Sequence, residues 1–393
     1  MAMFIQMATF LHQYFYEAGH QMPKETGALR VGILSTAMIN PAGIIRPAQT
    51  HPDVLVTAIA SRDLKQAQQA AKSYGIPTAF GSYEALLQEP GIDVVYISVP
   101  NGMHGTWARK ALEAGKHVIL EKPFTANADE ARSIVKLAQE KNLVLMEGFH
   151  WQYHPSAHVV KQIIDSGKYG EILRTYSRMT TPKGTMPRFN IRWKYALAGG
   201  ALMDMTYVIS ATRYFLGAGA PREIAEAKAR AIPEDPRVDE AMEATMRFDL
   251  NGRMVESRIY CDMDRSYLLG VIPRFWEQPS IEIELEHATI YYYNFQMPHL
   301  YHYIQIYDKR TAQTHTEKHY SGGPQWGSRG EPWWSTYRYQ LEAFVDKVRG
   351  REPPHWVTLE SSVAQMETID AIYEKSGLGK RQPTPENVDP PRV

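Results

Sequence analysis

The chain has 393 residues, more than one ordinary hydrophobic core accommodates, so two domains are expected. Lys plus Arg and Asp plus Glu both number 43, which leaves no net charge to attract nucleic acid or an anionic membrane. The single cysteine, Cys261, excludes an internal disulfide and a cysteine-based zinc site and fits a reducing compartment. With no apolar run near the ~20 residues of a membrane span, we expect a cytoplasmic, metal-free protein that binds neither nucleic acid nor membrane.

Residues 1–28 are predicted to form an N-terminal extension, and from residue 29 short apolar runs alternate with helical patterns. Strands are predicted over 29–34, 54–60, 78–80, 93–98, 117–120 and 143–147, with helices from the first turn to about Thr50 and over 64–74, 83–88, 105–114 and 128–140. Six strands separated by helices predict a doubly wound parallel sheet that ends near residue 148.

The turn after the first strand has a degraded nucleotide-binding motif, with Ser35, Ala37 and Asn40 in the places of G-x-G-x-x-G. Ser and Ala are small enough to let a pyrophosphate approach the following helix, whose amino end favours an anion. We therefore assign Ser35, Thr36, Ala37 and Ile39 to cofactor binding. Taken alone, the turn fits an ordinary strand-turn-helix unit equally well.

Two further strand ends carry candidate cofactor residues. The second strand ends in Ser61 and Arg62, and a hydroxyl with an arginine suits a 2′-phosphate better than a ribose diol, which favours NADP over NAD. Arg62 is alternatively a solvated residue at a helix start. The fourth strand is followed by Pro100, Asn101 and His104, of which Asn101 can donate to a ribose or nicotinamide and His104 is placed on the cofactor side.

The fifth strand ends in Glu121, Lys122 and Pro123. A lysine at the carboxyl end of a central strand points into the crevice where open α/β sheets bind ligands, so chemistry is expected there and Glu121 and Lys122 are assigned to cofactor binding. The alternative is that Glu121 and Lys122 are loop charges before the next helix.

Beyond residue 148 the pattern changes to a helix ending near Ser166 and then to hairpin-like strand spacings. Strands are predicted over 172–179, 223–231, 241–249, 253–261, 281–285, 288–294 and 303–307, forming an antiparallel sheet with one helical face. A helix over 200–216 carries Asp204 and Tyr207 three residues apart, hence on one face. Helices over 337–349 and 359–375 are expected to return to the first domain, and the tail from Gly379 is expected to be mobile.

Three segments read together give a resemblance: Glu121-Lys122-Pro123, Ala198-Gly199-Gly200-Ala201-Leu202-Met203-Asp204 and the segment 337–344. Over roughly residues 29–378 the chain resembles the Gfo/Idh/MocA oxidoreductases, and within them the branch of NADP-dependent D-xylose and dihydrodiol dehydrogenases. The resemblance implies a Rossmann domain over 29–148 and an α/β domain over 149–378. The latter is built on a large open, mainly antiparallel sheet, through which relatives pair as homodimers.

The resemblance also implies roles for individual residues. Lys122 matches the lysine beside the nicotinamide and the reacting hydroxyl, and Asp204 matches the acidic residue on the catalytic helix. This branch has an acid/base tyrosine four residues after that aspartate, where this chain has Val208, while Tyr207 comes one residue earlier. Such a shift rotates a helical side chain by about 100°, so Tyr207 reaches the family's position only if the turn is locally shortened. Relatives often carry arginine where this chain has Gln152.

The resulting hypothesis is reversible hydride transfer between NADP and a carbinol carbon of a sugar, polyol, cyclic diol or related small ring substrate. Tyr207 is the expected acid/base, with its pKa lowered by Lys122, and Asp204 orients the substrate or Lys122. Substrate contacts are assigned to Trp151, Tyr153, Arg192 and Trp193, although the aromatics equally suit a core or dimer contact and Arg192 an exposed loop cation. A catalytically silent NADP sensor and a redox-neutral enzyme with retained cofactor remain as alternatives.

Overall fold

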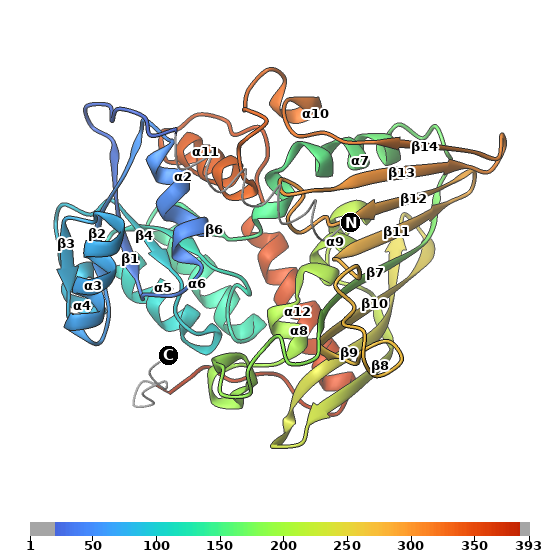
Figure 1. The fold of residues 1–393 in the computed structure, drawn as a ribbon, viewed down its shortest axis with the longest axis horizontal. Helices are drawn as coiled ribbons and strands as arrows, with labels where there is room; N and C mark the ends of the chain where they lie inside the picture. Colours follow the sequence, from blue (N-terminus) through green and yellow to red (C-terminus); the bar gives the residue numbers. More distant parts are fainter. Residues whose placement is uncertain (1–19, 386–393) are drawn as a thin grey trace.

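The computed structural model describes residues 20–385, so residues 1–19 of the expected extension and residues 386–393 of the expected tail lie outside the described residues. Two sheets lie side by side with helices between them, and Figure 1 shows α9 and α12 in this intermediate layer. Within residues 20–385, no helix is long and apolar enough to cross a membrane.

The first sheet is parallel throughout, in the order β3-β2-β1-β4-β5-β6. Its strands are β1 (Leu29–Leu34), β2 (Val54–Ala60), β3 (Thr78–Phe80), β4 (Val94–Ile97), β5 (His117–Leu120) and β6 (Leu145–Glu147). The accompanying helices are a π-helix η1 (Pro41–Ile45), α2 (Arg46–Gln49), α3 (Leu64–Tyr74), α4 (Tyr83–Leu87), a 3-10 helix η2 (Asn101–Met103), α5 (His104–Glu113) and α6 (Ala128–Glu140). Asp63, Ser82 and Asn127 cap α3, α4 and α6 by accepting from backbone N–H groups, which satisfies donors that have no partner within the helix.

The second sheet has eight strands in the order β14-β13-β12-β11-β7-β10-β9-β8. They are β7 (Ile172–Pro182), β8 (Glu223–Ile232), β9 (Asp235–Leu250), β10 (Arg253–Arg265), β11 (Ser280–Leu285), β12 (Ala288–Tyr293), β13 (Tyr303–Asp308) and β14 (Gln313–Glu317). Only β7 and β10 pair in parallel, so the predicted fold class is confirmed. Strand β14 was not predicted, because its five residues are polar, four of them are exposed, and the segment therefore shows no apolar alternation.

The helices of the second part are η3 (His150–Tyr153), α7 (Pro155–Asp165), η4 (Ile191–Trp193), η5 (Tyr195–Leu197), α8 (Ala201–Asp204), α9 (Tyr207–Leu216), α10 (Gly323–Trp326), α11 (Thr336–Val348) and α12 (Leu359–Lys375). As predicted, the two closing helices return to the first domain. Helix α11 packs on η1 and α2, and α12 contacts α6 and β6 on one side and α9 and β8 on the other. The two domains therefore share these helices as a common layer.

The prediction of a mobile tail from Gly379 is wrong for residues 379–385. Arg381 is fully buried and Thr384 nearly so, and the Thr384 N–H donates to the carbonyl of Gly102 at 2.7 Å. The Asn127 side chain donates to the carbonyl of Arg381 at 2.9 Å. The prolines and charges of this segment are typical of a solvated tail. The prediction failed because the residues that contact Arg381 lie far away in the sequence.

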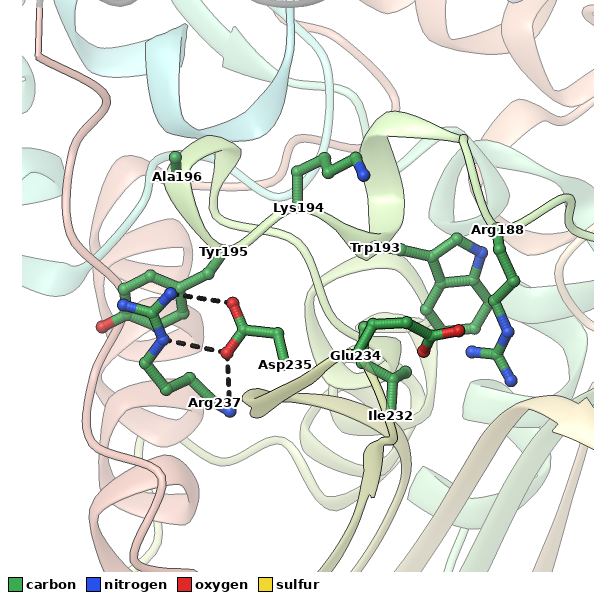
Figure 2. A pocket seen from close by; sticks show the side chains of 9 residues that line it. All are labelled: Arg188, Trp193, Lys194, Tyr195, Ala196, Ile232, Glu234, Asp235 and Arg237. Atoms are coloured by element: carbon green, nitrogen blue, oxygen red, sulfur yellow. Dashed lines mark hydrogen bonds and ion pairs between the residues drawn. The ribbon is translucent and has the colours of Figure 1, made fainter.

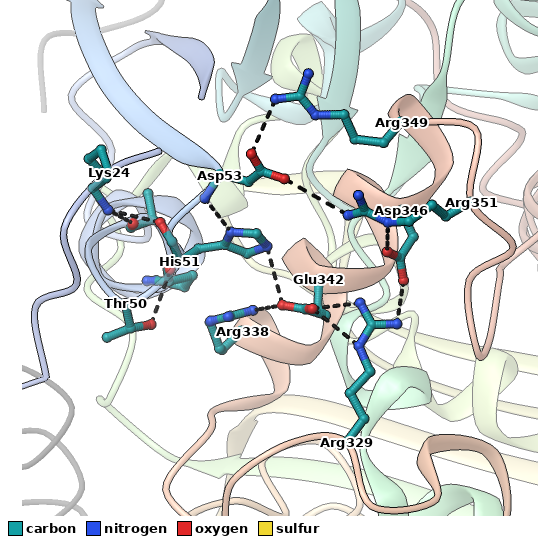
Figure 3. Close-up of polar contacts among 12 residues, drawn as sticks. Lys24, Thr50, His51, Asp53, Arg329, Arg338, Glu342, Asp346, Arg349 and Arg351 are labelled. Atoms are coloured by element: carbon teal, nitrogen blue, oxygen red, sulfur yellow. Dashed lines mark hydrogen bonds and ion pairs between the residues drawn. The ribbon is translucent and has the colours of Figure 1, made fainter. Parts of the chain in front are cut away.

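A polar network connects the start of the chain and α2 to helix α11 (Figure 3). The Lys24 ammonium donates to the carbonyls of Ala48, Gln49 and His51 at 2.6, 3.2 and 2.9 Å, which satisfies acceptors at the end of α2. The ring of His51 then lies 3.2 Å from the carboxylate of Glu342 on α11.

Glu342 is the centre of this network. Its carboxylate accepts hydrogen bonds from Arg329 and Arg338, and the Arg338 side chain is only 3% exposed. Burial by itself raises the pKa of Glu342, but the contact with His51 and the charge of Arg338 hold it well below its usual range. The carboxylate therefore stays ionised and compensates the buried charge of Arg338.

Glu342→Ala is expected to lower the free energy of unfolding by about 3–5 kcal/mol, because it removes the carboxylate that pairs with the buried Arg338 guanidinium. The matched control is Glu84→Ala, which removes an exposed pair with Lys110 and should change stability by no more than about 0.5 kcal/mol. Urea unfolding at pH 7 measures both, and equal losses in the two variants would contradict this role of Glu342.

Candidate active site

The carboxyl ends of four neighbouring strands meet at one edge of the first sheet. Strand β1 pairs with β2 and β4, and β4 pairs with β5, so the segments that follow these strands lie next to one another. The predicted cofactor residues around Ser35, Ser61, Asn101 and Lys122 all follow these four strands. This edge is where open α/β sheets bind their ligands.

The turn after β1 is built around Ser35, which has a φ of 101°, a value that glycine adopts more easily than serine. The Ser35 hydroxyl lies 3.0 Å from both the carbonyl and the hydroxyl of Ser98, and it accepts from the N–H of Ala37. Thr36 on the outer side of the turn is exposed. Serine hydrogen bonds thus hold the backbone conformation that glycines hold in the usual motif.

Gly43 is a residue that the sequence analysis missed in this region. A Cβ atom at this position would lie 2.1 Å from the hydroxyl oxygen of Tyr96 on β4, so only glycine lets η1 pack this closely on the sheet. The sequence signal that could have identified Gly43 is its position three residues after Asn40, the last residue of the degraded nucleotide-binding motif.

The end of β2 lies beside this turn, since the Ser35 N–H donates to the carbonyl of Ala60 at 3.0 Å. Ser61 is buried and accepts from the N–H of Asp63, while Arg62 is exposed. The structure therefore places an exposed arginine next to the Ser35 turn.

After β4, Asn101 and His104 have different surroundings. Asn101 is half-buried and donates to the carbonyl of Ala198 at 3.4 Å, so it contacts the loop before α8. His104 is buried, its ring nitrogens lie 2.7 and 2.9 Å from the carbonyls of Pro123 and Val99, and burial lowers its pKa to about 4. The structure thus does not support a cofactor contact for His104, because both its nitrogens face protein carbonyls.

Lys122 brings the predicted catalytic residues together. Its ammonium donates to the backbone carbonyl of Asp204 at 2.8 Å and lies 3.4 Å from the Asp204 carboxylate. The same nitrogen lies 5.0 Å from the centre of the Tyr207 ring, over its face. Glu121 instead turns inward, accepts from the Tyr96 hydroxyl at 2.6 Å, and has a pKa raised by burial.

The Asp204 carboxylate contacts two cations through the same oxygen. Arg192 donates to Oδ1 through Nε at 2.7 Å, and the Lys122 ammonium lies 3.4 Å from that atom. Burial favours the neutral acid, but the charges of Arg192 and Lys122 hold the pKa of Asp204 well below its usual range. Asp204 is therefore ionised, and Arg192 is its partner rather than an exposed loop cation.

Tyr207 reaches Lys122 because the predicted helix over 200–216 is interrupted. Helix α8 ends at Asp204, and Val208 and Ile209 donate to the carbonyls of Met205 and Thr206, three residues back, as in a tighter 3-10 turn. This local shortening brings the Tyr207 ring within 5.0 Å of the Lys122 ammonium.

The expected lowering of the Tyr207 pKa is wrong. Burial and then the charge of Glu121 raise the pKa of Tyr207 well above its usual value. The ring is 1% exposed, and the Lys122 ammonium lies over the ring face. The phenol oxygen lies 3.0 Å from Nε2 of His150, a buried residue that the sequence analysis missed.

Two residues assigned to the substrate pocket belong to the core instead. Trp151 is fully buried, and its indole N–H donates to the Ser210 hydroxyl at 3.3 Å. Tyr153 is also fully buried, and its hydroxyl accepts from the N–H of Val357 at 3.4 Å. Gln152 donates to Ser210 at 2.9 Å and so fills a place in the same interior. Aromatic composition alone does not separate core from pocket, because both favour large rings.

Trp193 lies in the wall of a separate pocket of about 310 Å³, shown in Figure 2. Nine residues line it: Arg188, Trp193, Lys194, Tyr195, Ala196, Ile232, Glu234, Asp235 and Arg237. Although Trp193 follows Arg192 directly, the two side chains have different partners, since Arg192 contacts Asp204. The lining of this pocket does not include Lys122, Asp204 or Tyr207.

Helix α8 is held in place by the C-terminal segment. Asp239 accepts from the backbone N–H of Leu202 at 2.8 Å, from Tyr373 at 2.9 Å and from Arg381 at 2.7 Å. Arg381 also donates to the carbonyl of Gly199 at 2.9 Å. Neither Asp239 nor Arg381 was singled out in the sequence, because 142 residues separate them.

Comparisons with known proteins agree with this arrangement. Residues 29–149 match the family described as "Oxidoreductase family, NAD-binding Rossmann fold", and residues 158–291 match the "GFO/IDH/MocA C-terminal domain". The chain is 34% identical over 355 residues to D-xylose 1-dehydrogenase (NADP(+)) 2 of Haloferax volcanii, covering 88% of this chain and 97% of that protein. It is 32% identical over 200 residues to trans-1,2-dihydrobenzene-1,2-diol dehydrogenase of Macaca fascicularis, which covers 50% of this chain and 59% of that protein.

A solved structure is similar over nearly the whole fold. KijD10, a 3-ketoreductase from Actinomadura kijaniata in complex with NADP and TDP-benzene, superposes with a TM-score of 0.72 at 25% identity, covering 88% of this chain and 97% of that chain. The chain belongs to the Gfo/Idh/MocA oxidoreductase family, as the resemblance implied. It is thus an oxidoreductase that uses a nicotinamide cofactor.

Gly200→Ala is expected to damage both stability and activity, because Gly200 has a φ of 138° and an added Cβ would lie 2.1 Å from the Asp239 carboxylate. We expect a loss of about 2–4 kcal/mol in the free energy of unfolding and a displaced α8 with lower turnover. The control Gly219→Ala has no atom within 4 Å of the new Cβ and should match the parent protein. Thermal unfolding and initial rates measure both, and a Gly200→Ala protein like its control would refute the anchoring.

Proposed function

We propose that this protein is an NADP-dependent dehydrogenase or reductase. It transfers a hydride between NADP(H) and a carbinol or carbonyl carbon of a sugar, polyol, cyclic diol or related ring substrate. The main support is that Lys122, Asp204 and Tyr207 lie together at the carboxyl ends of the parallel strands, where nucleotide-binding folds hold their cofactor. The relatives support the substrate class, since their names are those of D-xylose and dihydrodiol dehydrogenases.

The strand ends fit the parts of NADP. The segment Ser35–Ile39 suits the pyrophosphate, because Ser35, Thr36 and Ala37 are small and precede a helix. Ser61 and Arg62 suit the 2′-phosphate through a hydroxyl and a guanidinium. Pro100 and Asn101, with Lys122, would hold the nicotinamide end. When bound, the nicotinamide accepts or gives the hydride.

The residues of this chain supply the remaining chemistry. Lys122 donates a hydrogen bond to the substrate oxygen and stabilises negative charge that develops there. Asp204 holds the Lys122 ammonium in place through two contacts and is itself oriented by Arg192. Tyr207 exchanges the hydroxyl proton with the substrate as the hydride moves.

The proposal also includes assembly and location. The face of the second sheet that bears Tyr176, Met254 and Arg258 carries exposed apolar side chains among charged ones, which suits a homodimer contact. A cytoplasmic location fits the single buried free cysteine, Cys261.

The test of the function compares the parent protein with Lys122→Met. A fluorescence titration with NADPH should show binding to both proteins, because Lys122 contributes one contact among many. In a screen of sugars, polyols and cyclic alcohols that follows reduced-cofactor absorbance, we expect turnover by the parent protein and a loss of about 10²–10⁴ in kcat for Lys122→Met.

Each other outcome contradicts part of the proposal. NADPH binding without turnover on the whole panel would indicate a silent NADP-binding protein. Product formation without net cofactor reduction would indicate redox-neutral chemistry with a retained cofactor.

Arg62→Ala is expected to weaken NADPH binding about tenfold and to leave NADH binding unchanged, because only NADPH has the phosphate that the guanidinium pairs with. The control Lys72→Ala removes an exposed cation near the other end of α3 and should alter neither affinity. Fluorescence titrations give all four constants, and equal losses for the two cofactors would rule out a 2′-phosphate contact.

A further inference from the structure

A continuous chain of hydrogen-bonding groups leads away from the Tyr207 phenol. The phenol oxygen lies 3.0 Å from Nε2 of His150, and Nδ1 of His150 lies 2.8 Å from the Thr336 hydroxyl. That hydroxyl lies 3.3 Å from Nδ1 of His299. The four groups come from α9, η3, α11 and the loop after β12, so no single helix or strand accounts for their alignment.

In this series of hydrogen bonds, each donor lies on the Tyr207 side of its acceptor. Nδ1 of His299 accepts from the backbone N–H of Thr336 at 3.4 Å, so this nitrogen carries a lone pair. The Thr336 hydroxyl can then donate to His299 and accept from Nδ1 of His150. Because a neutral imidazole has one donor and one acceptor, Nε2 of His150 accepts from the Tyr207 hydroxyl.

The residues around His150 preserve these hydrogen-bond directions. His150 is fully buried and stacks on Tyr337, with the ring centres 3.9 Å apart, which holds the plane of the imidazole. Burial lowers the pKa of His150 well below its usual value, so the ring is neutral at pH 7. Of the three relay residues, only His299 keeps measurable exposure, at 9%. The series of hydrogen bonds therefore runs from the buried Tyr207 phenol to His299, which is 9% exposed.

We propose that His150, Thr336 and His299 form a proton relay that connects Tyr207 with solvent during hydride transfer. This inference rests on the proposed function. It answers a difficulty of the site: the raised pKa of Tyr207 disfavours a free phenolate, whereas a relay lets the phenol lose one proton as it takes another.

The steps balance in the direction of alcohol oxidation. Bound NADP+ would take the substrate hydride, and the substrate O–H proton moves to the Tyr207 oxygen while the phenol proton moves to Nε2 of His150. The Nδ1 proton of His150 passes to Thr336, whose own proton passes to Nδ1 of His299, and His299 releases its Nε2 proton to water. Carbonyl reduction runs the same transfers backwards.

The Tyr207 phenol also interacts with a partly exposed residue. The Gln296 side chain favours the ionised phenol and lowers the pKa of Tyr207, against the larger effect of burial. His150, Thr336 and His299 do not touch Lys122 in this arrangement and act through Tyr207, so they are positioning and relay residues.

The test is Thr336→Val, which keeps the side-chain shape and removes the hydroxyl. The control is Thr368→Val, which removes a buried hydroxyl bonded only to the carbonyl of Ala364 in α12. We expect kcat of alcohol oxidation to fall about tenfold or more in Thr336→Val. Its solvent deuterium isotope effect should rise above that of the parent protein, because proton transfer becomes limiting, and KM for NADP+ should stay unchanged.

A second variant tests the outer end of the relay. His299→Ala should also be slow, and imidazole added to the buffer should restore its rate in proportion to concentration, whereas Thr336→Val should gain nothing from imidazole. This variant keeps the test decisive if Thr336→Val does not fold.

The outcomes separate this inference from the proposed function. Turnover by the parent protein, with Thr336→Val equal to Thr368→Val in rate and isotope effect, overturns the relay alone. Absence of rescue in His299→Ala overturns the assignment of His299 as the exit. A parent protein that turns over no substrate overturns the proposed function, and the relay with it.

Discussion

The partly buried carboxylate of Asp204 is the group on which the rest of the site depends. Removing a carboxylate from water without a partner costs free energy, and here two cations, Lys122 and Arg192, compensate it at the same oxygen. One cation, Lys122, follows a strand of the first domain, and the other, Arg192, lies in η4 of the second domain, as does Asp204 in α8. The contacts of Lys122 with Asp204 therefore connect the two domains, while Arg192 supports Asp204 from within its own domain.

Because Asp204 belongs to α8, the position of this helix matters, and residues from distant parts of the chain hold its start in place. Gly200 permits the close approach of Asp239, Asp239 caps the helix at Leu202, and Arg381 returns from the end of the chain to neutralise Asp239. On the other side of the molecule, Glu342 performs a comparable task by joining α11 to the loop after α2. Both networks place charged groups in the interior, where their strength depends on complete pairing.

Features of the fold and the site that depend on local sequence pattern could be predicted from the sequence. The strands β1 to β6 follow from short apolar runs, and Lys122 follows from its place at a strand end. The interruption at Met205 and Thr206 could not be predicted, since it depends on contacts of α8 with distant residues. For the same reason Trp151 and His104 were assigned to the crevice, although buried hydrogen-bond partners hold both in the interior. His150 carried no local signal, because its role depends on Tyr207 and Thr336, 57 and 186 residues away.

The most direct test of the catalytic role of Lys122 is a crystal structure of the protein with NADP+. We expect the nicotinamide beside the Lys122 ammonium, with Asp204 still bonded to Lys122 and Arg192, and the 2′-phosphate beside Arg62. A nicotinamide bound away from Lys122, or a bound cofactor with Lys122 and Asp204 separated, would contradict the claim that this ion cluster is the catalytic centre.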